Sequence, residues 1–350
     1  MTIPRTSRRH VRLLAIALLV AALAASCGGA VAGGQTASTS ATAVPTGIAG
    51  ATSPDPGASA AATVTPSGSA APRPSPATAS PPHPVPRDLT PSLSKAKTDL
   101  PPIYADGCHL GFTASKPLPC AFGDTASSTR VVAIGDSNAA QWFPALERLA
   151  VARHWRLESL TKSACTIADI AVWQSSLGRT YTECAAWRSL VLARIKAEHP
   201  ALVIAVTSRG YHLVLGGRQV PLAGHESTYQ AALDRTLRTL RATAGHVVLL
   251  GATPDAHVDP PVCLAAHLAD ARACATPLAK ATSASFSSME IAAAGSAGVR
   301  WVDPTSWVCT ADPCMPIAGR ILVYRDPGHL TATFAASLAS RMGSALPAIR

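Results

Sequence analysis

The stretch that decides the fold is Arg130-Val-Val-Ala-Ile-Gly-Asp-Ser-Asn138. Its apolar run, 130–134, predicts a buried β-strand, and the glycine that follows predicts a tight turn at the end of that strand. From Gln141 to His154, Trp142, Leu146 and Leu149 recur at helical spacing. The stretch therefore indicates a strand, a turn and a helix in direct succession.

The same alternation continues to the end of the chain. Short apolar runs predict strands at 155–160, 202–206, 247–250 and 299–302. Amphipathic stretches predict helices at 183–198, 226–244, 278–294 and 331–342. Alternating strands and helices are typical of an α/β fold, here a parallel sheet of about five strands with helices on both faces. Ligand sites in such sheets lie at the carboxyl ends of the strands, which directs attention to Ile134, Leu160, Val206, Leu250 and Val302.

Composition shows that only part of the 350 residues forms this domain. Charged residues make up 14% of the chain, whereas roughly a quarter is usual, and there are 29 prolines and 24 glycines. Every aromatic residue lies at or after Tyr104. We therefore expect a folded domain over 104–350 and a disordered linker, rich in Ala, Pro, Ser and Thr, over 28–103. The linker is interpreted as a stalk that holds the domain away from a membrane, or as a plain spacer.

The first 27 residues have the pattern of an export signal. Arginines between positions 5 and 12 precede an unbroken apolar run, Leu13–Ala25. This run is shorter than the about 20 residues that a membrane-spanning helix needs, and it suits a signal peptide. Ala24-Ala25-Ser26-Cys27 resembles a bacterial lipobox and predicts lipidation of Cys27; an ordinary secretory signal is the alternative. We expect an exported protein, lipid-anchored at the outer face of a bacterial cytoplasmic membrane or in the cell wall.

The cysteines favour disulfides. Nine are present, and without Cys27 an even number remains in an oxidising compartment. In chain order they form four close pairs: Cys108 with Cys120, Cys165 with Cys184, Cys263 with Cys274, and Cys309 with Cys314. A zinc site is the alternative, but none of the spacings is CxxC. We expect no metal and no cofactor.

The net charge of +10 is spread thinly along the chain. The basic residues form no run in the domain and do not alternate with aromatic residues. A nucleic-acid partner is therefore not expected.

Two short motifs carry chemistry. Ser137 stands at a strand-to-helix turn, where the N–H groups that open the helix can stabilise an oxyanion. A serine needs a base to act as a nucleophile, and Asp326-Pro-Gly-His329 supplies one near the end of the chain. Asp326 is close enough in sequence to orient the imidazole of His329.

Together these motifs resemble the SGNH/GDSL hydrolase superfamily, whose serine lies in a GDS motif near the domain start and whose Asp and His form a DxxH near its end. Gly135–Ala140, Thr161-Lys-Ser-Ala-Cys165 and the Cys309/Cys314 pair before Tyr324-Arg-Asp326 look like one subgroup. That subgroup is the SGNH domain often fused to acyltransferase-3 membrane proteins, which O-acylate envelope polysaccharides. The resemblance covers 104–350 and implies a flavodoxin-like three-layer α/β/α sandwich, the SGNH hydrolase fold. It also implies that Ser137 is the nucleophile, His329 the base and Asp326 its orienter.

One feature departs from the superfamily. Its third block usually supplies a Gly and an Asn to the oxyanion hole, but here the block reads Thr207-Ser208-Arg209-Gly210. The chain has a single asparagine, Asn138, directly after the proposed nucleophile. We therefore expect the hole to use backbone N–H groups of Ser137 and of the Ser163-Ala164 loop. Side chains that can assist there or bind substrate are Asn138, Thr207, Ser208 and Arg209.

The sequence thus predicts an exported serine O-acyltransferase or O-acylesterase that acts on a cell-envelope glycan through an acyl-enzyme. A separate membrane protein is a possible acyl donor. Trp173, Tyr211 and Trp307 fall in expected loops and are candidates for stacking on sugars. The alternative is a non-catalytic envelope-binding lipoprotein that retains the fold, which the missing third-block Asn favours. A third hypothesis is a lipase-like esterase of soluble substrates.

Overall fold

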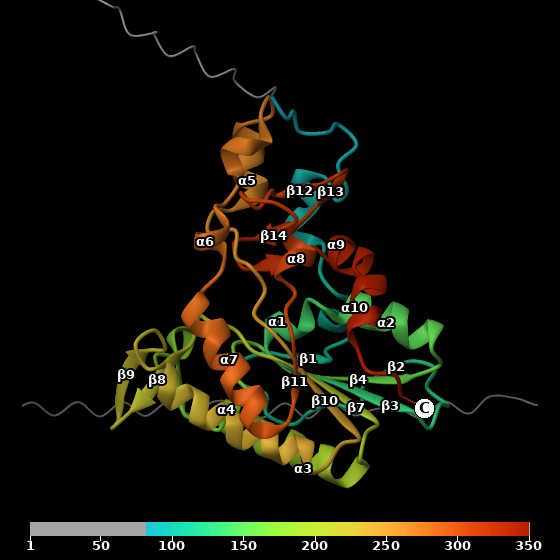
Figure 1. The fold of residues 1–350 in the computed structure, drawn as a ribbon, viewed down its shortest axis with the longest axis vertical. Helices are drawn as coiled ribbons and strands as arrows, with labels where there is room; N and C mark the ends of the chain where they lie inside the picture. The colour runs from blue at the N-terminus through green and yellow to red at the C-terminus, as the bar shows by residue number, and fades with distance from the viewer. Residues whose placement is uncertain (1–81, 350) are drawn as a thin grey trace, which may run out of the picture. The chain divides into compact units, whose positions relative to one another are not determined.

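A parallel sheet forms the centre of the domain in the computed structural model, which describes residues 82–349 (Figure 1). Its five main strands are β3 (Arg130–Gly135), β4 (Arg156–Lys162), β7 (Leu202–Val206), β10 (His246–Leu250) and β11 (Arg300–Val302). They pair in parallel in the order β4-β3-β7-β10-β11. This is the flavodoxin-like order, in which the switch point falls between the first and third strands, here β3 and β7. The expected parallel sheet is confirmed.

Two short strands extend the sheet beyond β4. Strand β1 (His109–Leu110) pairs with it in parallel, and β2 (Ala121–Gly123) pairs with it in antiparallel orientation. The sheet therefore has seven strands among the described residues. The sequence did not predict β1 and β2, because two or three residues are too few to show a periodic pattern.

Helices cover both faces of the sheet, as Figure 1 shows. One face carries α3 (Thr182–Glu198), α4 (Glu226–Arg241) and α7 (Ala284–Ala297). The other carries α1 (Ser137–Ala140), α2 (Phe143–Ala152), α9 (Ala332–Ser337) and α10 (Ala339–Ala345). Successive strand residues alternate between the two layers, so that Val132 packs in the first core and Val131 in the second. The three-layer α/β/α sandwich is confirmed.

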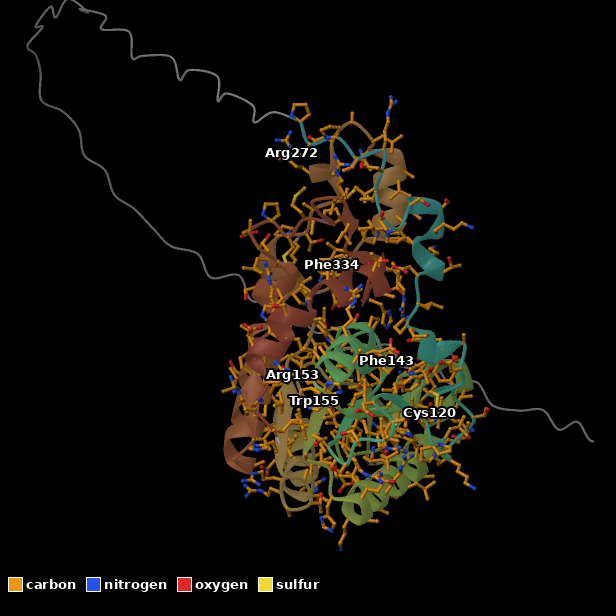
Figure 2. The ribbon with its side chains drawn as sticks, turned by 90° about the vertical axis from the view of Figure 1, so that its right-hand side faces the viewer. Cys120, Phe143, Arg153, Trp155, Arg272 and Phe334 are labelled. Atoms are coloured by element: carbon orange, nitrogen blue, oxygen red, sulfur yellow. A yellow bond between two sulfur atoms is a disulfide. The ribbon has the colours of Figure 1, made fainter. Side chains whose placement is uncertain are left out.

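Large apolar side chains fill both layers. Trp187 of α3 is fully buried in the first, and Trp142 is fully buried in the second. Phe143 of α2 and Phe334 of α9 also belong to the second layer (Figure 2). Burial of one such side chain stabilises the fold by about 1.5–3 kcal/mol. Trp142 and Trp187 are therefore core residues.

The helix predicted over 141–154 is α2, and a separate short helix, α1, precedes it from Ser137. Two other predicted helices are interrupted in the structure. The predicted helix 278–294 is α6 (Leu278–Ala281) followed by α7. Helix α6 ends at its C-cap Thr282, and Ser283 caps α7 by accepting a hydrogen bond from the Phe286 N–H. The last predicted helix is divided at Leu338 into α9 and α10.

The loops hold smaller elements that the sequence did not predict. A four-stranded antiparallel sheet joins β6 (Arg179–Thr180), β5 (Val172–Gln174), β8 (His212–Leu215) and β9 (Arg218–Pro221). The remaining elements are short, and they are η1 (Leu93–Thr98), η2 (Pro102–Tyr104), η3 (Ser175–Leu177), α5 (Pro260–Ala266), η4 (Ala271–Cys274), α8 (Thr305–Val308), β12 (Ile317–Ala318), β13 (Ile321–Leu322), β14 (Tyr324–Asp326) and β15 (His329–Leu330).

Residues 82–103 differ from the expected linker. Leu89, Ala96 and Ile103 are buried against the domain. The Thr90 N–H donates to the carbonyl of Arg320 at 2.8 Å, and Asp99 accepts from the Thr333 N–H at the start of α9 at 3.0 Å. This part of the chain packs because isolated apolar residues fit gaps in the domain surface, a pattern that composition alone does not reveal. The expectation of disorder up to residue 103 is therefore corrected for 82–103.

All four expected disulfides are present, with the pairing Cys108–Cys120, Cys165–Cys184, Cys263–Cys274 and Cys309–Cys314. This confirms pairing in chain order.

The signal segment, Cys27 and the linker up to residue 81 lie outside the described residues. Within 82–349, no helix combines the length and the apolar character needed to cross a membrane.

Candidate active site

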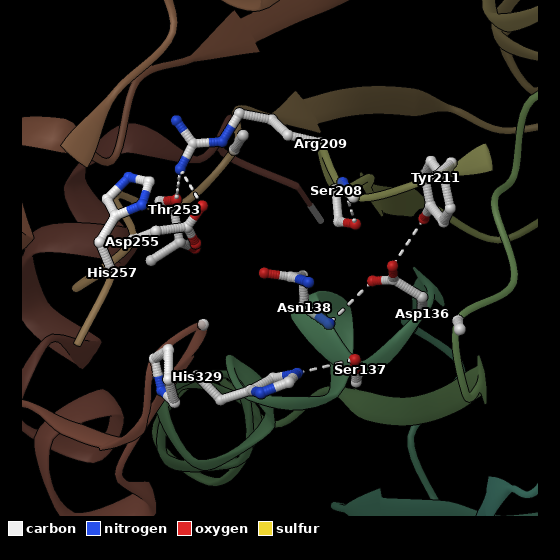
Figure 3. A pocket seen from close by; sticks show the side chains of 15 residues that line it. Asp136, Ser137, Asn138, Ser208, Arg209, Tyr211, Thr253, Asp255, His257 and His329 are labelled. Carbon is white, nitrogen blue, oxygen red and sulfur yellow. Dashed lines mark hydrogen bonds and ion pairs between the residues drawn. The ribbon is translucent and has the colours of Figure 1, made fainter. Parts of the chain in front are cut away.

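A pocket of about 440 Å³ opens at the carboxyl ends of β3, β7 and β10 (Figure 3). Its walls come from the turn after β3, the segment Ser208–Tyr211 after β7, the segment after β10 and the loop between β14 and β15. This is the edge of the sheet, beside the switch point between β3 and β7, where doubly wound folds bind ligands. Ser137 and His329 both line it.

The turn after β3 places Ser137 in the pocket. Gly135 has φ +154°, and a Cβ there would lie 2.4 Å from the carbonyl oxygen of Val206, so the turn requires glycine. Asp136 caps α1 by accepting a hydrogen bond from the Asn138 N–H at 2.8 Å. Ser137 is therefore fixed as the first residue of a helix that starts directly at the sheet edge.

The hairpin β14–β15 brings His329 to the serine. Asp326 and His329 are opposite each other in its register, joined by Pro327 and Gly328. His329 Nδ1 lies 2.8 Å from Asp326 Oδ1, and Nε2 lies 2.8 Å from Ser137 Oγ. An ionised carboxylate only accepts hydrogen bonds, so Nδ1 carries the proton and Nε2 accepts from the Ser137 hydroxyl. Figure 3 shows the contact between His329 and Ser137.

Asp326 is held as a carboxylate by its surroundings. It accepts from the Gly328 N–H at 3.0 Å and from Arg325 Nε at 3.3 Å. Burial raises its pKa, but the hydrogen bond and charge of His329, together with Gly328 and Arg325, outweigh burial and lower that pKa below its ordinary value. Arg325 in turn lies 5.5 Å from the centre of the Tyr104 ring. The three side chains Ser137, His329 and Asp326 thus form one continuous series of contacts.

Asp136 is a second carboxyl group of the site and, unlike the half-buried Asp326, it is fully buried. It is 1% exposed and accepts from the Tyr211 hydroxyl at 2.6 Å as well as from the Asn138 N–H. Burial raises the pKa of Asp136, against the effect of these two hydrogen bonds. Tyr211 follows β7, so this contact ties the nucleophile turn to the third-block segment. A role for Asp136 was not predicted from the sequence, although its place directly before the serine that opens a helix was a usable signal.

Gln141 connects three walls of the pocket through hydrogen bonds. The sequence did not predict this role. It is fully buried, and its Nε2 donates to Asn138 Oδ1 at 3.2 Å and to Thr253 Oγ1 at 2.9 Å. Its Oε1 accepts from the Leu330 N–H at 2.8 Å, next to His329. Asn138 Oδ1 accepts from Gln141, whereas its NH₂ group has no acceptor within residues 82–349; Figure 3 shows this side chain at the pocket.

Two backbone N–H groups are candidates for an oxyanion hole. Ser137 and Ala164 line the pocket, and neither N–H has an acceptor within residues 82–349. Ala164 has φ +49°, a conformation that non-glycine residues adopt only rarely. Ala164 follows β4, one of the strands whose carboxyl ends are expected to border a ligand site.

Only some of the other residues predicted for the oxyanion hole reach the pocket. Ser208 and Arg209 line the pocket. Ser163 does not, since its N–H donates to the Leu110 carbonyl at 2.8 Å and its hydroxyl lies 3.0 Å from His109 Nε2. Thr207 is fully buried, and its hydroxyl is 2.5 Å from that of Tyr229. Ser163 and Thr207 are therefore not brought to the pocket.

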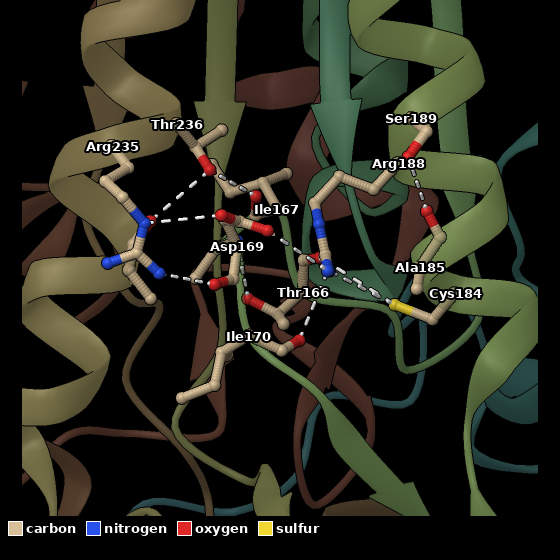
Figure 4. A network of polar contacts seen from close by, with 12 residues as sticks. Thr166, Ile167, Asp169, Ile170, Cys184, Ala185, Arg188, Ser189, Arg235 and Thr236 are labelled. Atoms are coloured by element: carbon tan, nitrogen blue, oxygen red, sulfur yellow. Dashed lines mark hydrogen bonds and ion pairs between the residues drawn. The ribbon is translucent and has the colours of Figure 1, made fainter.

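Contacts with α3 and α4 hold the loop that carries Ala164. The disulfide Cys165–Cys184 links it to α3, and Arg188 of α3 donates to the carbonyls of Thr166 at 3.2 Å and Ile170 at 3.3 Å. Thr236 of α4 donates to the Ile167 carbonyl at 2.9 Å (Figure 4). The position of the Ala164 N–H is thus fixed by contacts with two helices.

The segment after β10 supplies residues that the sequence analysis did not propose. Asp255 pairs with Arg209 Nη2 at 2.6 Å, and Thr253 and His257 also line the pocket. Their position in the sequence was a usable signal, because they follow Leu250, one of the strand ends at which a ligand site is expected.

The three candidates for sugar stacking have different surroundings. Tyr211 lines the pocket but is buried, with its hydroxyl on Asp136. Trp173 lies in β5, and Trp307 packs edge-on against Trp142 at 5.9 Å. His109 is buried beside Thr161 and Ser163, and burial lowers its pKa to about 4.

Comparison with known proteins gives one family. A family model described as "SGNH domain (fused to AT3 domains)" matches residues 101–343, more than half of the chain. No curated protein matches this chain.

Solved structures with a related arrangement include a lipopolysaccharide acetyltransferase periplasmic domain of Salmonella ser. Paratyphi A (TM-score 0.49, 15% identity, covering 69% of this chain and 86% of that one). A Bacteroides fragilis protein described as a "putative acylhydrolase" has a TM-score of 0.37 and 14% identity over 62% of this chain and 86% of that one. TesA has a TM-score of 0.33 and 17% identity over 62% and 97%.

Proposed function

The chain belongs to the family of SGNH domains fused to AT3 domains, enzymes of acyl transfer or hydrolysis, and from this membership we propose that it is an exported serine O-acyltransferase or O-acylesterase of a cell-envelope glycan. The observation that carries the proposal is the series of contacts from Ser137 Oγ to His329 Nε2 and from His329 Nδ1 to Asp326, each about 2.8 Å at its shortest. These distances suit proton transfer between the groups.

In the first half-reaction, Ser137 Oγ attacks the carbonyl carbon of an acyl donor and its proton passes to His329 Nε2. Asp326 stabilises the imidazolium that forms and keeps the ring oriented. The tetrahedral intermediate collapses as the bond to the donor oxygen breaks, and His329 returns its proton to that oxygen. The acyl group is then an ester on Ser137.

In the second half-reaction, an acceptor hydroxyl or water attacks this ester. His329 Nε2 takes the proton of the attacking O–H, the bond to Ser137 Oγ breaks, and the proton moves to Ser137. A sugar hydroxyl as acceptor makes the reaction a transfer, and water makes it a hydrolysis.

We assign the oxyanion hole to the N–H groups of Ser137 and Ala164 and to the side-chain amide of Asn138. The missing third-block Asn favoured a non-catalytic protein. The amide of Asn138, directed into the same pocket by Gln141, supplies a donor of the same kind, and this supports catalysis. Donors preorganised in this way act where charge develops in the transition state.

The envelope glycan is proposed from the family, whose AT3-fused members O-acylate envelope polysaccharides. The chain ahead of the domain is proposed to be a signal segment, a lipid anchor at Cys27 and a stalk, with a membrane protein as acyl donor. A Cys27→Ser variant is expected to leave the membrane fraction, and its retention there would contradict lipidation.

The experiment that tests the function compares O-acyl groups on the envelope glycan by mass spectrometry. Three strains are needed: one with the protein, one without it and one with Ser137→Ala. A transferase predicts loss of acyl groups in the last two strains, and an esterase predicts a gain. Identical acylation in all three would contradict the proposal.

A further inference from the structure

A second cavity adjoins the catalytic pocket. Its volume is about 260 Å³, and it lies at the starts of α4 and α7. Arg209, Asp255 and His257 line both cavities, so the two share one wall. We call it the acceptor cavity, defined by that wall together with Glu226, Lys280, Thr282, Ser283 and Ser285. Its volume is below the about 300–1,000 Å³ of pockets that hold drug-sized ligands, which restricts its occupant to a small unit.

Leu222, Ala223 and Phe286 complete the lining of the acceptor cavity, which therefore combines apolar surface with charged and hydroxyl groups, and its charges balance. Lys280 and Glu226 add one charge of each sign, and the shared Arg209 and Asp255 are already paired at 2.6 Å. A highly anionic polymer requires an excess of positive charge, which this balanced lining lacks. Sugar hydroxyls both donate and accept hydrogen bonds, so they match a lining of carboxylate, ammonium and hydroxyl groups.

The shared wall is rigidly connected. Arg209 Nη2 donates to the carbonyls of Thr253 at 3.1 Å and Ala281 at 2.9 Å, besides its pairing with Asp255. His257 Nε2 lies 2.5 Å from the Lys280 carbonyl. These contacts fix Lys280 and Ala281 relative to the catalytic pocket. A ligand that spans both cavities therefore meets a preformed surface, which lowers the entropic cost of binding.

We propose that the acceptor cavity binds a neutral sugar unit of the glycan, next to the unit whose hydroxyl reacts at Ser137. This inference rests on the proposed function and names the acceptor class. The bound sugar chain presents the neighbouring hydroxyl to the acyl-enzyme: its O–H proton goes to His329, its oxygen bonds the acyl carbon, and the bond to Ser137 breaks. Occupancy of the cavity favours sugar over water as the acceptor.

The test uses the full-length protein with 4-nitrophenyl acetate as donor. The acceptors are oligosaccharides released from the envelope glycan of the producing bacterium and de-O-acylated by mild alkali. Ser285→Trp fills the acceptor cavity, and Ser288→Trp is the matched control, because Ser288 is exposed on the same helix outside the cavity. 4-Nitrophenol release without acceptor and acetylated oligosaccharide are measured separately, with thermal unfolding as the check on folding.

We expect Ser285→Trp to lower acetylated oligosaccharide at least tenfold while 4-nitrophenol release stays unchanged, and Ser288→Trp to change neither. Lys280→Ala should raise the KM for oligosaccharide roughly tenfold, as for the loss of one charged hydrogen bond. Unchanged transfer by Ser285→Trp, or equal loss of both activities in a folded variant, would overturn the inference. Wild-type protein that releases 4-nitrophenol but acetylates no oligosaccharide would also overturn it and leave an esterase. No 4-nitrophenol release by the wild type would count against the proposed function itself.

Discussion

His329 Nε2 lies 2.8 Å from Ser137 Oγ, although 192 positions separate the two residues in the chain. The contact exists because β3 ends where the β14–β15 hairpin passes over the sheet edge. Each partner is fixed locally, the serine by the Asp136 cap and the histidine by Asp326. The predictions that follow depend on this arrangement.

Asp326→Asn should abolish most activity without unfolding the protein. An amide at this position can present its NH₂ group to the ring and favour the wrong tautomer of His329, in which Nε2 carries the proton and cannot act as base. We expect kcat for an aryl ester to fall by about 10³–10⁴, as for the same change in other serine triads. Steady-state kinetics, with circular dichroism as the folding control, measure it; a fall below tenfold would contradict the role of Asp326.

Asn138→Ala should lower kcat by about 10²–10³ and leave the KM for a small ester little changed, because an oxyanion donor acts in the transition state. Ser208→Ala, at the same pocket, is the matched control and should have a much smaller effect. Equal effects of the two substitutions would remove Asn138 from the oxyanion hole.

Loss of the Cys165–Cys184 disulfide should reduce both stability and activity. Its removal by a double Cys→Ser substitution costs about 3 kcal/mol on the chain-entropy account and loosens the loop that holds Ala164. Removal of Cys263–Cys274 is the control, since neither cysteine lines the pocket. Denaturant unfolding and ester hydrolysis measure the two effects. A control variant that loses as much activity as the first would mean that destabilisation, rather than the Ala164 loop, is responsible.

The buried carboxyl group of Glu290 should make the free energy of unfolding depend on pH. It is buried in α7, where its Oε2 accepts from the Ala252 N–H at 3.2 Å and from Trp301 Nε1 at 3.4 Å. Burial raises its pKa to about 8. The folded protein therefore binds a proton that the unfolded chain releases near pH 4.5, so this contribution to stability is complete below about pH 4.5 and is lost as pH rises to about 8.

Glu290→Gln should remove that dependence and stabilise the protein at pH 8 by a few kcal/mol relative to the wild type, because one pKa unit corresponds to about 1.4 kcal/mol. Denaturant unfolding between pH 5 and about 8 measures it. Parallel stability curves for the two proteins would show that Glu290 titrates normally.

The regular part of the fold was predictable because it repeats. Apolar runs such as Leu202–Val206 are buried in the middle of a parallel sheet, and they coincide with the strands of the structure. The four-stranded antiparallel sheet was not predictable, since strands such as Arg179–Thr180 are too short to show a period. The burial of Leu89 and Ile103 depends on gaps in the tertiary structure, which composition does not encode.

The candidate site was likewise predictable where it depends on local motifs and not where it depends on tertiary contacts. Ser137, Asp326 and His329 stand in local motifs, and the structure places them in contact. Tyr211 and Gln141 act through contacts with Asp136, Thr253 and Leu330, and these depend on how distant segments meet. Thr207 and Ser163 were expected at the pocket because of their sequence positions, but their side chains turn toward Tyr229 and His109 instead.

The central claim is that Ser137 is a nucleophile activated by His329. The most direct measurement is covalent labelling of the folded protein with a fluorophosphonate, followed by mass spectrometry of the peptide that contains Ser137. The account predicts stoichiometric labelling at Ser137 that is lost in Ser137→Ala and strongly slowed in His329→Ala. A folded wild-type protein that stays unlabelled, or that is labelled equally fast without His329, would contradict it.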